Sequence, residues 1–275
     1  MDLGDDLTLT ALDEPGCYEA VLTDRWWIVT GPNGGLLAAL LLRAVQALVG
    51  PSRPELAPRI LTVQFLNGPV QGPVRLRASV DKDGRRICFA SAEMTQDGRP
   101  ICRARVTLAA SLGTAFDLSD HAMPAVPPPS DCPVLDPAAT YGNARTRWQR
   151  REVASAGPGE VAGWLRLDPP VPIDPAVLAL MCDNLPPSLR GHVADPDLAE
   201  RTHTTTIELT VYVRRPDTGL DPDDECLVLL RSASVVDGLH QEEGEVWSAD
   251  GRLLATSRQL ALVFVRDPDV PSDPA

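Results

Sequence analysis

The stretch TQDGRPICRARVTLA, residues 95–109, recurs in altered form as SADGRLLATSRQLAL, residues 248–262. Both stretches place Asp-Gly-Arg at the same point and continue into a strand-like run. Two further matching pairs lie upstream in the same order, VDKDGRRI (80–87) with SVVDGLHQ (234–241) and VQFLNGPVQG (63–72) with TVYVRRPDTG (210–219). Because the order of the pairs is preserved, the sequence predicts two copies of one structural unit.

The two copies also agree in their expected secondary structure. A strand and then an apolar helix are predicted in each copy, with the helices at residues 33–49 and 174–185. Four strand-like runs follow each helix, at 59–66, 73–82, 85–95 and 99–110 in the first copy and at 204–215, 225–236, 238–248 and 252–265 in the second. Asp-Gly pairs favour the positive φ that tight hairpin turns require, and they occur at 83/84, 97/98, 237/238 and 250/251. Consecutive hairpins predict an antiparallel sheet.

The helices are apolar nearly all round, which is typical of a helix enclosed by a curved sheet rather than one lying on a surface. One such sheet cannot bury both its edge and its face alone, so two units are expected to pack side by side. The predicted fold class is therefore α+β, with two tandem units that each wrap an antiparallel sheet around a central helix.

Composition predicts where these units begin and end. The first unit is assigned to residues 1–117 and the second to residues 139–267. Between them, residues 118–138 are rich in proline and lack periodicity, as expected of a linker, because proline removes a backbone donor and favours extended coil. Residues 268–275 are predicted to form a frayed acidic tail.

The charge of the chain excludes several classes of partner. It has 275 residues and a formal net charge of −13, which argues against binding nucleic acid or an anionic membrane surface. The first residues are acidic, unlike a signal peptide, and the longest apolar run, residues 36–49, is too short to span a bilayer. The six cysteines show no CxxC or metal-binding spacing. We therefore expect a cytoplasmic protein with reduced thiols and neither a metal nor a redox cofactor.

One acidic residue is unusual for its position. In ALMCDNLPP, residues 179–187, Asp183 follows an apolar helical run that begins well, with Asp174 as a capping residue and Pro175 in the first turn. That phase places Asp183 in the last helical turn, where the helix dipole and burial would both raise the pKa of its carboxyl group. Such a carboxylate suits abstraction of a proton from water. The alternative is that Asp183 only caps the following turn.

Four segments resemble the double hot-dog acyl-CoA thioesterases, the thioesterase II (TesB-like) family. They are GPNGGLLAALLLRAV (31–45), MCDNLPP (181–187), HTTTIELTVYVRR (203–215) and ATSRQLALVFV (255–265). The resemblance implies a tandem hot-dog fold, hydrolysis of an acyl-CoA thioester in lipid metabolism, and a water held by Asp183, Thr206 and Gln259. The family commonly has an aromatic-His-Arg sequence where this chain has VYVRR, residues 211–215.

Two features of this set can be derived from the residues themselves. With the Asp-Gly-Arg turns aligned, Gln259 corresponds to Val106, and the first helix contains no acid, so one active site per chain is expected. Strict alternation along the strand places Thr206 on the face opposite Leu209 and Val211, so Thr206 reaches the helix only if the strand twists or bulges at its start.

The start of the first helix offers a further candidate. The backbone N–H groups of Gly34 and Gly35 could bind the carbonyl oxygen of a thioester as negative charge develops on it. Alternatively, the glycines only permit a tight turn and close packing.

Three questions stay open from the sequence. The same fold could be a non-catalytic acyl-binding or scaffolding protein. A hot-dog dehydratase or hydratase would need a well-placed His-Asp pair, which the sequence does not provide. A homodimer or higher oligomer is also compatible with the sheet surfaces.

Overall fold

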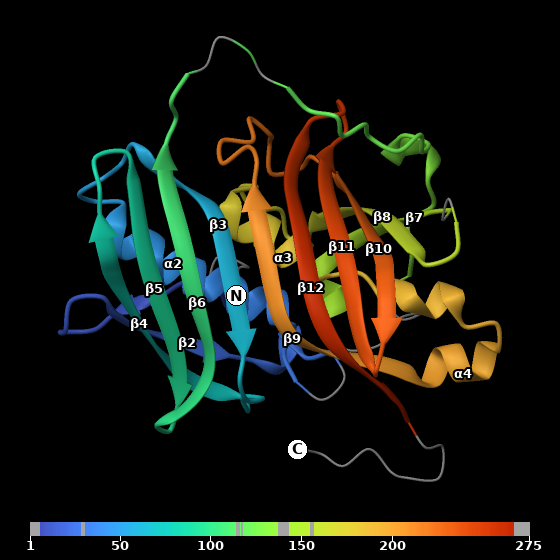
Figure 1. Cartoon of the computed structure of the whole chain (residues 1–275), viewed down its shortest axis with the longest axis horizontal. Helices are drawn as coiled ribbons and strands as arrows, with labels where there is room; N and C mark the ends of the chain where they lie inside the picture. The colour runs from blue at the N-terminus through green and yellow to red at the C-terminus, as the bar shows by residue number, and fades with distance from the viewer. Residues whose placement is uncertain are drawn as a thin grey trace.

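The computed structural model describes residues 6–28, 31–113, 116, 118–136, 143–154 and 157–266. The acidic tail predicted at 268–275 lies outside these residues, and the predicted unit boundaries stay a prediction. Two halves are visible in Figure 1, each with a broad antiparallel sheet and a helix behind it. The predicted α+β class is confirmed. Among the described residues, no helix is long and apolar enough to cross a membrane.

The first half contains one long helix, α2 (Gly34–Val49), and a short 3-10 turn, η1 (Asp24–Trp26). Its strands are β1 (Thr10–Ala11), β2 (Cys17–Leu22), β3 (Leu56–Phe65), β4 (Gly72–Asp83), β5 (Ile87–Gln96) and β6 (Arg99–Ala110). All four strands predicted after the first helix are present within a few residues of their expected bounds.

The second half repeats this order with additional short helices. Its strands are β7 (Trp148–Val153), β8 (Glu160–Leu167), β9 (Thr202–Val213), β10 (Cys226–Val236), β11 (Leu239–Ser248) and β12 (Leu253–Val265). The helical elements are η2 (Pro129–Asp131), η4 (Asn143–Arg147), α3 (Pro175–Met181), η5 (Ser188–His192) and α4 (Pro196–Arg201). The short helices η5 and α4, which follow α3, were not predicted from the sequence.

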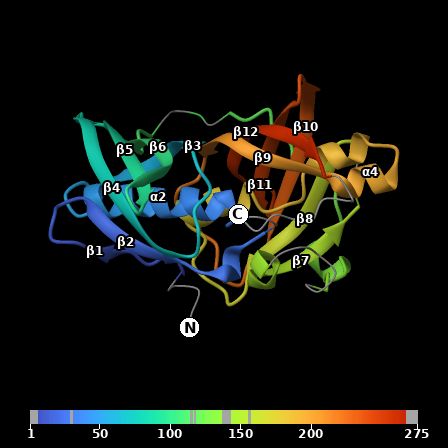
Figure 2. The same ribbon diagram turned by 90° about the horizontal axis from the view of Figure 1, so that it is seen from below.

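The two halves form one continuous sheet of twelve strands, in the order β1-β2-β4-β5-β6-β3-β9-β12-β11-β10-β8-β7. Strands β3 and β9 join the halves in antiparallel fashion, with Leu61 opposite Val211 and Val63 opposite Leu209. Figure 2 shows each half of the sheet curling around its own side of the molecule. Pairing of the two edge strands satisfies the backbone groups that a single unit would leave open.

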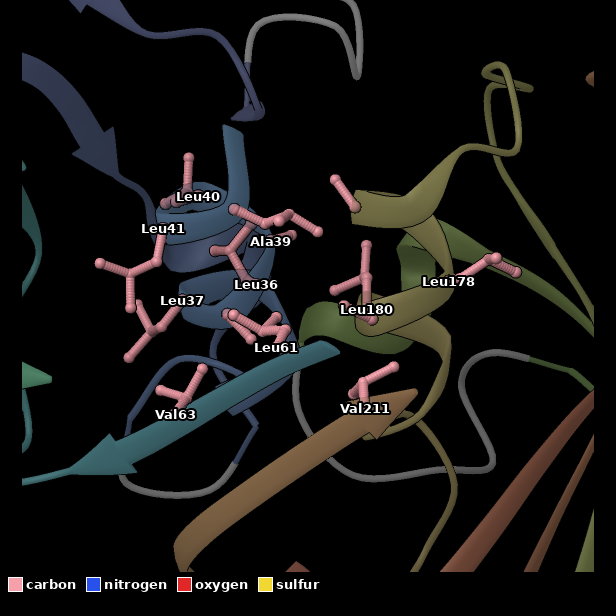
Figure 3. Packing of buried hydrophobic residues seen from close by; sticks show 14 of the residues in the cluster. Leu36, Leu37, Ala39, Leu40, Leu41, Leu61, Val63, Leu178, Leu180 and Val211 are labelled. Carbon is pink, nitrogen blue, oxygen red and sulfur yellow. The ribbon is translucent and has the colours of Figure 1, made fainter. Parts of the chain in front are cut away.

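The core lies between this sheet and the helices α2 and α3. The residues from Leu36 to Leu42 are all at most 4% exposed, as are those from Ala176 to Met181. Figure 3 shows Leu61, Val63 and Val211 directed from β3 and β9 toward the two helices. The first turns of α2 and the whole of α3 are therefore enclosed, as the sequence predicted, while Ala47 near the end of α2 is exposed.

The hairpin predictions hold for part of the chain. Asp97 and Gly98 both have positive φ, as do Asp237 and Gly238, whereas at 250/251 only the glycine does. The prediction for 83/84 is wrong, because neither of these described residues has positive φ. There the N–H of Gly84 donates to the carbonyl of Ile87, so the turn is wider than a two-residue hairpin.

The predicted linker packs against the second half. Cys132 is 5% exposed and belongs to a small apolar cluster with Trp164 and Trp247, against which Met123 and Val126 also pack. The Nε1–H of Trp164 donates to the carbonyl of Pro127 at 3.0 Å. Its proline content keeps this segment largely out of the sheet, while its apolar residues fix it to the sheet surface.

Candidate active site

Helix α3 brings Asp183 to the middle of the molecule. The Asp174 carboxylate caps its start by accepting from the N–H groups of Ala176 and Val177, with Pro175 at the first position. The helix then ends at Met181, and Asp183 follows it in a tight turn. The prediction that Asp183 lies within the last helical turn is therefore wrong, because Asp183 is the second residue after the helix end.

The carboxylate of Asp183 is held by the start of the other helix. Its Oδ2 accepts from the N–H of Gly35 at 2.9 Å and lies 3.4 Å from Nδ2 of Asn33. The same Nδ2 donates to the main-chain carbonyl of Asp183 at 2.6 Å, while Oδ1 of Asn33 caps the N–H of Leu36 at 3.1 Å. The end of α3 and the start of α2 are thus joined at one place.

This contact bears on the role predicted for Gly34 and Gly35, which stays a prediction. In the structure the N–H of Gly35 donates to the carboxylate of Asp183. A Cβ at Gly34 would lie 2.9 Å from Oδ2 of Asp183, and a Cβ at Gly35 would lie 2.8 Å from the carbonyl oxygen of Leu180. The glycines permit this close approach, which is the alternative that the sequence left open.

Burial, together with a smaller effect of the nearby negative charge of Glu242, raises the pKa of Asp183 to about 7. The N–H groups of Gly35 and Gly34 oppose this shift because they stabilise the ionised form. The predicted upward direction is confirmed. A carboxyl group with a pKa near neutrality can accept a proton and release it again at physiological pH.

Thr206 and Gln259 come together as the sequence predicted. The Oγ1–H of Thr206 donates to Oε1 of Gln259 at 3.1 Å. A bulge makes this possible, because Leu260 pairs with Glu208 and the next residue, Ala261, already pairs with Thr206. The extra residue on β9 turns Thr206 to the inner face, which is the condition stated for its role.

A fourth polar residue, Glu242 on β11, completes the group and was missed from the sequence. It lies directly opposite Gln259 and is 2% exposed. Its Oε1 accepts from Nε2 of Gln259 at 3.1 Å, and its Oε2 accepts from Ser188 through the N–H at 3.1 Å and the Oγ–H at 2.9 Å. In the polar run HQEEGE the inward residue could not be chosen from the sequence, because Gln241, Glu242 and Glu243 are all polar.

Asp183 lies close enough to feel the charge of Glu242, but its described hydrogen-bond partners are Gly35 and Asn33 rather than Thr206 or Gln259. The structure therefore brings Thr206 and Gln259 into direct contact and places Asp183 beside their network. A water molecule between the two parts would complete the predicted set.

The other titratable groups of this region are poor candidates for catalysis. Burial raises the pKa of Cys182 to about 12, so its thiol is not a ready nucleophile. All six cysteines are free and buried. In the part of the chain that the structure describes, no three His, Cys, Asp or Glu side chains are grouped to hold a metal ion. The absence of a metal or cofactor stays a prediction.

Two known domain families match this chain in order. The acyl-CoA thioesterase N-terminal domain matches residues 23–109, and the acyl-CoA thioesterase C-terminal domain matches residues 118–263. The chain belongs to the acyl-CoA thioesterase family. The resemblance inferred from the four sequence segments is confirmed, and the thioesterase C-terminal domain is the half that contains Asp183, Thr206 and Gln259.

Similar proteins support the same fold for this thioesterase family member. A conserved protein of unknown function with a hot-dog fold from Alicyclobacillus acidocaldarius matches with a TM-score of 0.82 and 27% identity, covering 96% of this chain and 98% of that one. The acyl-CoA thioesterase II TesB2 from Mycobacterium marinum matches with a TM-score of 0.77 and 22% identity, covering 97% and 99%. An uncharacterized protein of Mycobacterium tuberculosis is 29% identical over 279 residues, covering 90% of this chain and 92% of that protein. The tandem hot-dog prediction is confirmed.

Proposed function

We propose that this chain hydrolyses acyl-CoA thioesters to a free acid and CoA by direct attack of water. One observation carries the proposal: Thr206 and Gln259 are hydrogen-bonded on the inner face of the second half of the sheet, beside the half-buried carboxylate of Asp183. Polar side chains that converge in an otherwise apolar core are costly unless they serve a function. CoA enters as part of the substrate, and no other cofactor is needed for hydrolysis.

Asp183 acts as the general base in this proposal. Its Oδ2 is held by Gly35, which leaves Oδ1 to take a proton from the attacking water. The water oxygen adds to the thioester carbonyl carbon, and the C–S bond then breaks to release the CoA thiolate. The proton held on Asp183 passes to the thiolate or to solvent, which restores the base.

Thr206 and Gln259 orient the water. Because Thr206 donates its only hydroxyl hydrogen to Oε1 of Gln259, its oxygen is left to accept a hydrogen bond from water. One Nε2 hydrogen of Gln259 is donated to Glu242, and the second is left to donate to the water oxygen. A water held in this way presents a lone pair in a fixed direction, as attack on a carbonyl requires.

The test is release of free thiol from a panel of acyl-CoAs of increasing chain length, followed with a thiol reagent. We expect turnover by the wild-type chain and a loss of about 10²- to 10⁴-fold in kcat for Asp183→Asn, with the fold preserved. Asp13→Asn, an exposed carboxylate change in the first half, is the matched control and should leave kcat unchanged. Wild-type rates in Asp183→Asn would refute the role of Asp183.

The same panel separates hydrolysis from the alternatives. A non-catalytic acyl-binding protein would bind acyl-CoAs, as isothermal titration would show, without releasing thiol from any of them. Hydration of an enoyl-CoA without thiol release would instead support the hydratase alternative. Either result would remove the hydrolase proposal and leave only the family and the fold.

A further inference from the structure

The buried carboxylate of Glu242 has no part in the proposed chemistry, yet it is tied to a residue that does. It is 2% exposed, and none of the Arg or Lys side chains that the structure describes forms an ion pair with it. Its hydrogen-bond partners are the N–H and hydroxyl of Ser188 and Nε2 of Gln259. A buried carboxylate without a cationic partner destabilises a fold, so stability alone does not explain its presence.

The chemistry of these partners fixes the direction of each hydrogen bond. Burial raises the pKa of Glu242, while the hydrogen bonds from Ser188 and Gln259 oppose this shift because they stabilise the ionised form. An ionised carboxylate can only accept, and a backbone N–H can only donate. Nε2 of Gln259 must therefore face Glu242, which leaves Oε1 to face Thr206. The hydroxyl of Thr206 then has to donate rather than accept.

From this polarity we infer that Glu242 is a positioning residue, which sets the orientation of the Gln259 amide and holds Thr206 as an acceptor toward the attacking water. The inference rests on the proposed hydrolysis. Glu242 occupies a position at which the first half has an apolar side chain. Val106, the counterpart of Gln259, lies opposite Ala90, so Ala90 takes the place of Glu242 there. Ser188, at the start of η5, holds Glu242 in place.

Several other groups face this network. Asp183 lies at the end of α3 and Cys182 beside it, His240 lies two residues before Glu242 on the same strand, and His192 lies at the end of η5. His240 is 1% exposed and has Nε2 at 3.1 Å from Oγ of Ser232. Burial lowers the pKa of His240, and the proximity of His192 acts in the same direction, which favours the neutral form of His240 beside Glu242.

The change Glu242→Gln tests the inference because it should reverse the donor and acceptor roles in the hydrogen bonds that join residue 242, Gln259 and Thr206. The side facing Ser188 must stay an oxygen to accept the backbone N–H, so the new amide nitrogen faces Gln259. Gln259 then has to turn its Oε1 toward residue 242, which presents Nε2 to Thr206. We expect kcat to fall by about 10- to 100-fold, the usual effect of removing a partner that orients a functional side chain, with KM nearly unchanged.

A double-mutant cycle separates positioning from general damage. In a Gln259→Ala background, adding Glu242→Gln should cause no further loss of kcat at pH values above the acid limb, where Asp183 is ionised in every variant and the residue that Glu242 orients is absent. Ser188→Ala removes one of the bonds to Glu242 and should give a smaller loss in the same direction. Gln96→Ala is the control, since Gln96 is also buried and hydrogen-bonded, to Val70, but lies in the first half.

The pH profile and a spectroscopic signal give readouts that a purely structural role would not move. Loss of the Glu242 charge lowers the pKa of Asp183, so the acid limb of kcat/KM should shift to lower pH in Glu242→Gln. The side-chain amide signals of Gln259 in NMR, assigned with Gln259→Ala, should also move in Glu242→Gln and stay in place in Gln96→Ala.

The proposed hydrolysis and the positioning role of Glu242 can be disproved independently of each other. If the wild-type chain releases no thiol, the proposed hydrolysis is wrong, while the Gln259 amide signals still report whether Glu242 orients that side chain. If Glu242→Gln retains wild-type kcat and an unchanged acid limb, or if its loss is fully additive with Gln259→Ala, the positioning role is overturned.

Discussion

The two halves of this protein share a backbone plan and differ in the side chains on its inner face. In the second half Gln259 is flanked by Leu209 on β9 and Glu242 on β11. At the matching place in the first half Val106 is flanked by Leu61 and Ala90. The sheet register is conserved while the polar residues are not, so the geometry of the sheet does not by itself create the site.

Even the bulge that exposes Thr206 to the inner face occurs in both halves. On β3, Pro58 pairs with Leu108 and Ile60 with Thr107, which leaves one extra residue, as on β9. Pro58, which takes the place of Thr206, is buried but has no hydroxyl to donate. The duplicated fold therefore supplies the right positions twice, and only the second copy fills them with hydrogen-bonding groups.

The helices differ as much as the strands agree. Helix α2 runs for 16 residues and fills the first half with apolar side chains, whereas α3 stops after 7 residues. Because α3 is short, the chain leaves the core early and places Asp183 against α2 and Ser188 against Glu242. Shortening one helix makes room for polar groups that a full-length helix would exclude.

The largest expected effect follows from making the second half resemble the first. The triple change Thr206→Val, Glu242→Ala and Gln259→Val replaces the polar set by apolar residues and should reduce kcat by about 10⁴-fold, since no water is oriented beside Asp183. The N–H and the hydroxyl of buried Ser188 lose their acceptor in this variant, so the free energy of unfolding should fall by about 1–3 kcal/mol while the fold is kept. Thiol release measures kcat, and urea unfolding measures stability. A triple variant that keeps its activity would show that the difference between the halves is not functional.

The next effect tests the contact between the helices. Gly35→Ala places a Cβ 2.8 Å from the carbonyl oxygen of Leu180, so α2 and α3 must move apart and Asp183 must shift with them. We expect a loss of about 100-fold in kcat, the effect of a displacement near 1 Å. Gly68→Ala, where no atom lies within 4 Å of the added Cβ, is the control. Equal activity of the two variants would contradict this account of Gly35.

A change in the core of the first half should lower the free energy of unfolding and leave catalysis unchanged. Leu41→Ala removes a fully buried side chain from α2 and should cost about 2–5 kcal/mol in the free energy of unfolding. It should leave kcat and its pH dependence unchanged, because α2 contributes to the site only through its first residues. Urea unfolding and thiol release on the same preparation give both values. A changed pH profile would show that the halves are coupled more closely than their contacts indicate.

The smallest expected effect is a dependence of stability on pH. The pKa of Asp183 is about 7 in the folded chain and lower when unfolded, so between these values folding is accompanied by proton uptake. Stability from this group is full below the unfolded pKa and is lost as pH rises through about 7. Asp183→Asn should therefore gain in melting temperature over the wild type as pH is raised. A difference independent of pH would contradict the raised pKa.

Much of the fold could be predicted because its signals are local. The alternation of apolar residues marked the strands, the matching Asp-Gly-Arg turns marked the duplication, and Asp174 with Pro175 marked the start of α3. The end of α3 was placed too late because Cys182 and Asn184 do not forbid a helix. At the point where the helix ends, the main-chain carbonyl of Asp183 accepts from Nδ2 of Asn33 at the start of α2, a contact that no local pattern reports.

The sequence alone determined that two similar units exist and that only the second contains an acid, a hydroxyl and an amide in the family's order. Tertiary structure alone decided that Gly35 holds Asp183, across 148 residues of chain, and that Glu242 rather than its polar neighbours faces Gln259. The reason is physical. Periodicity and capping depend on neighbours along the chain, whereas the partner of a buried polar group is chosen by whichever distant segment packing brings to it.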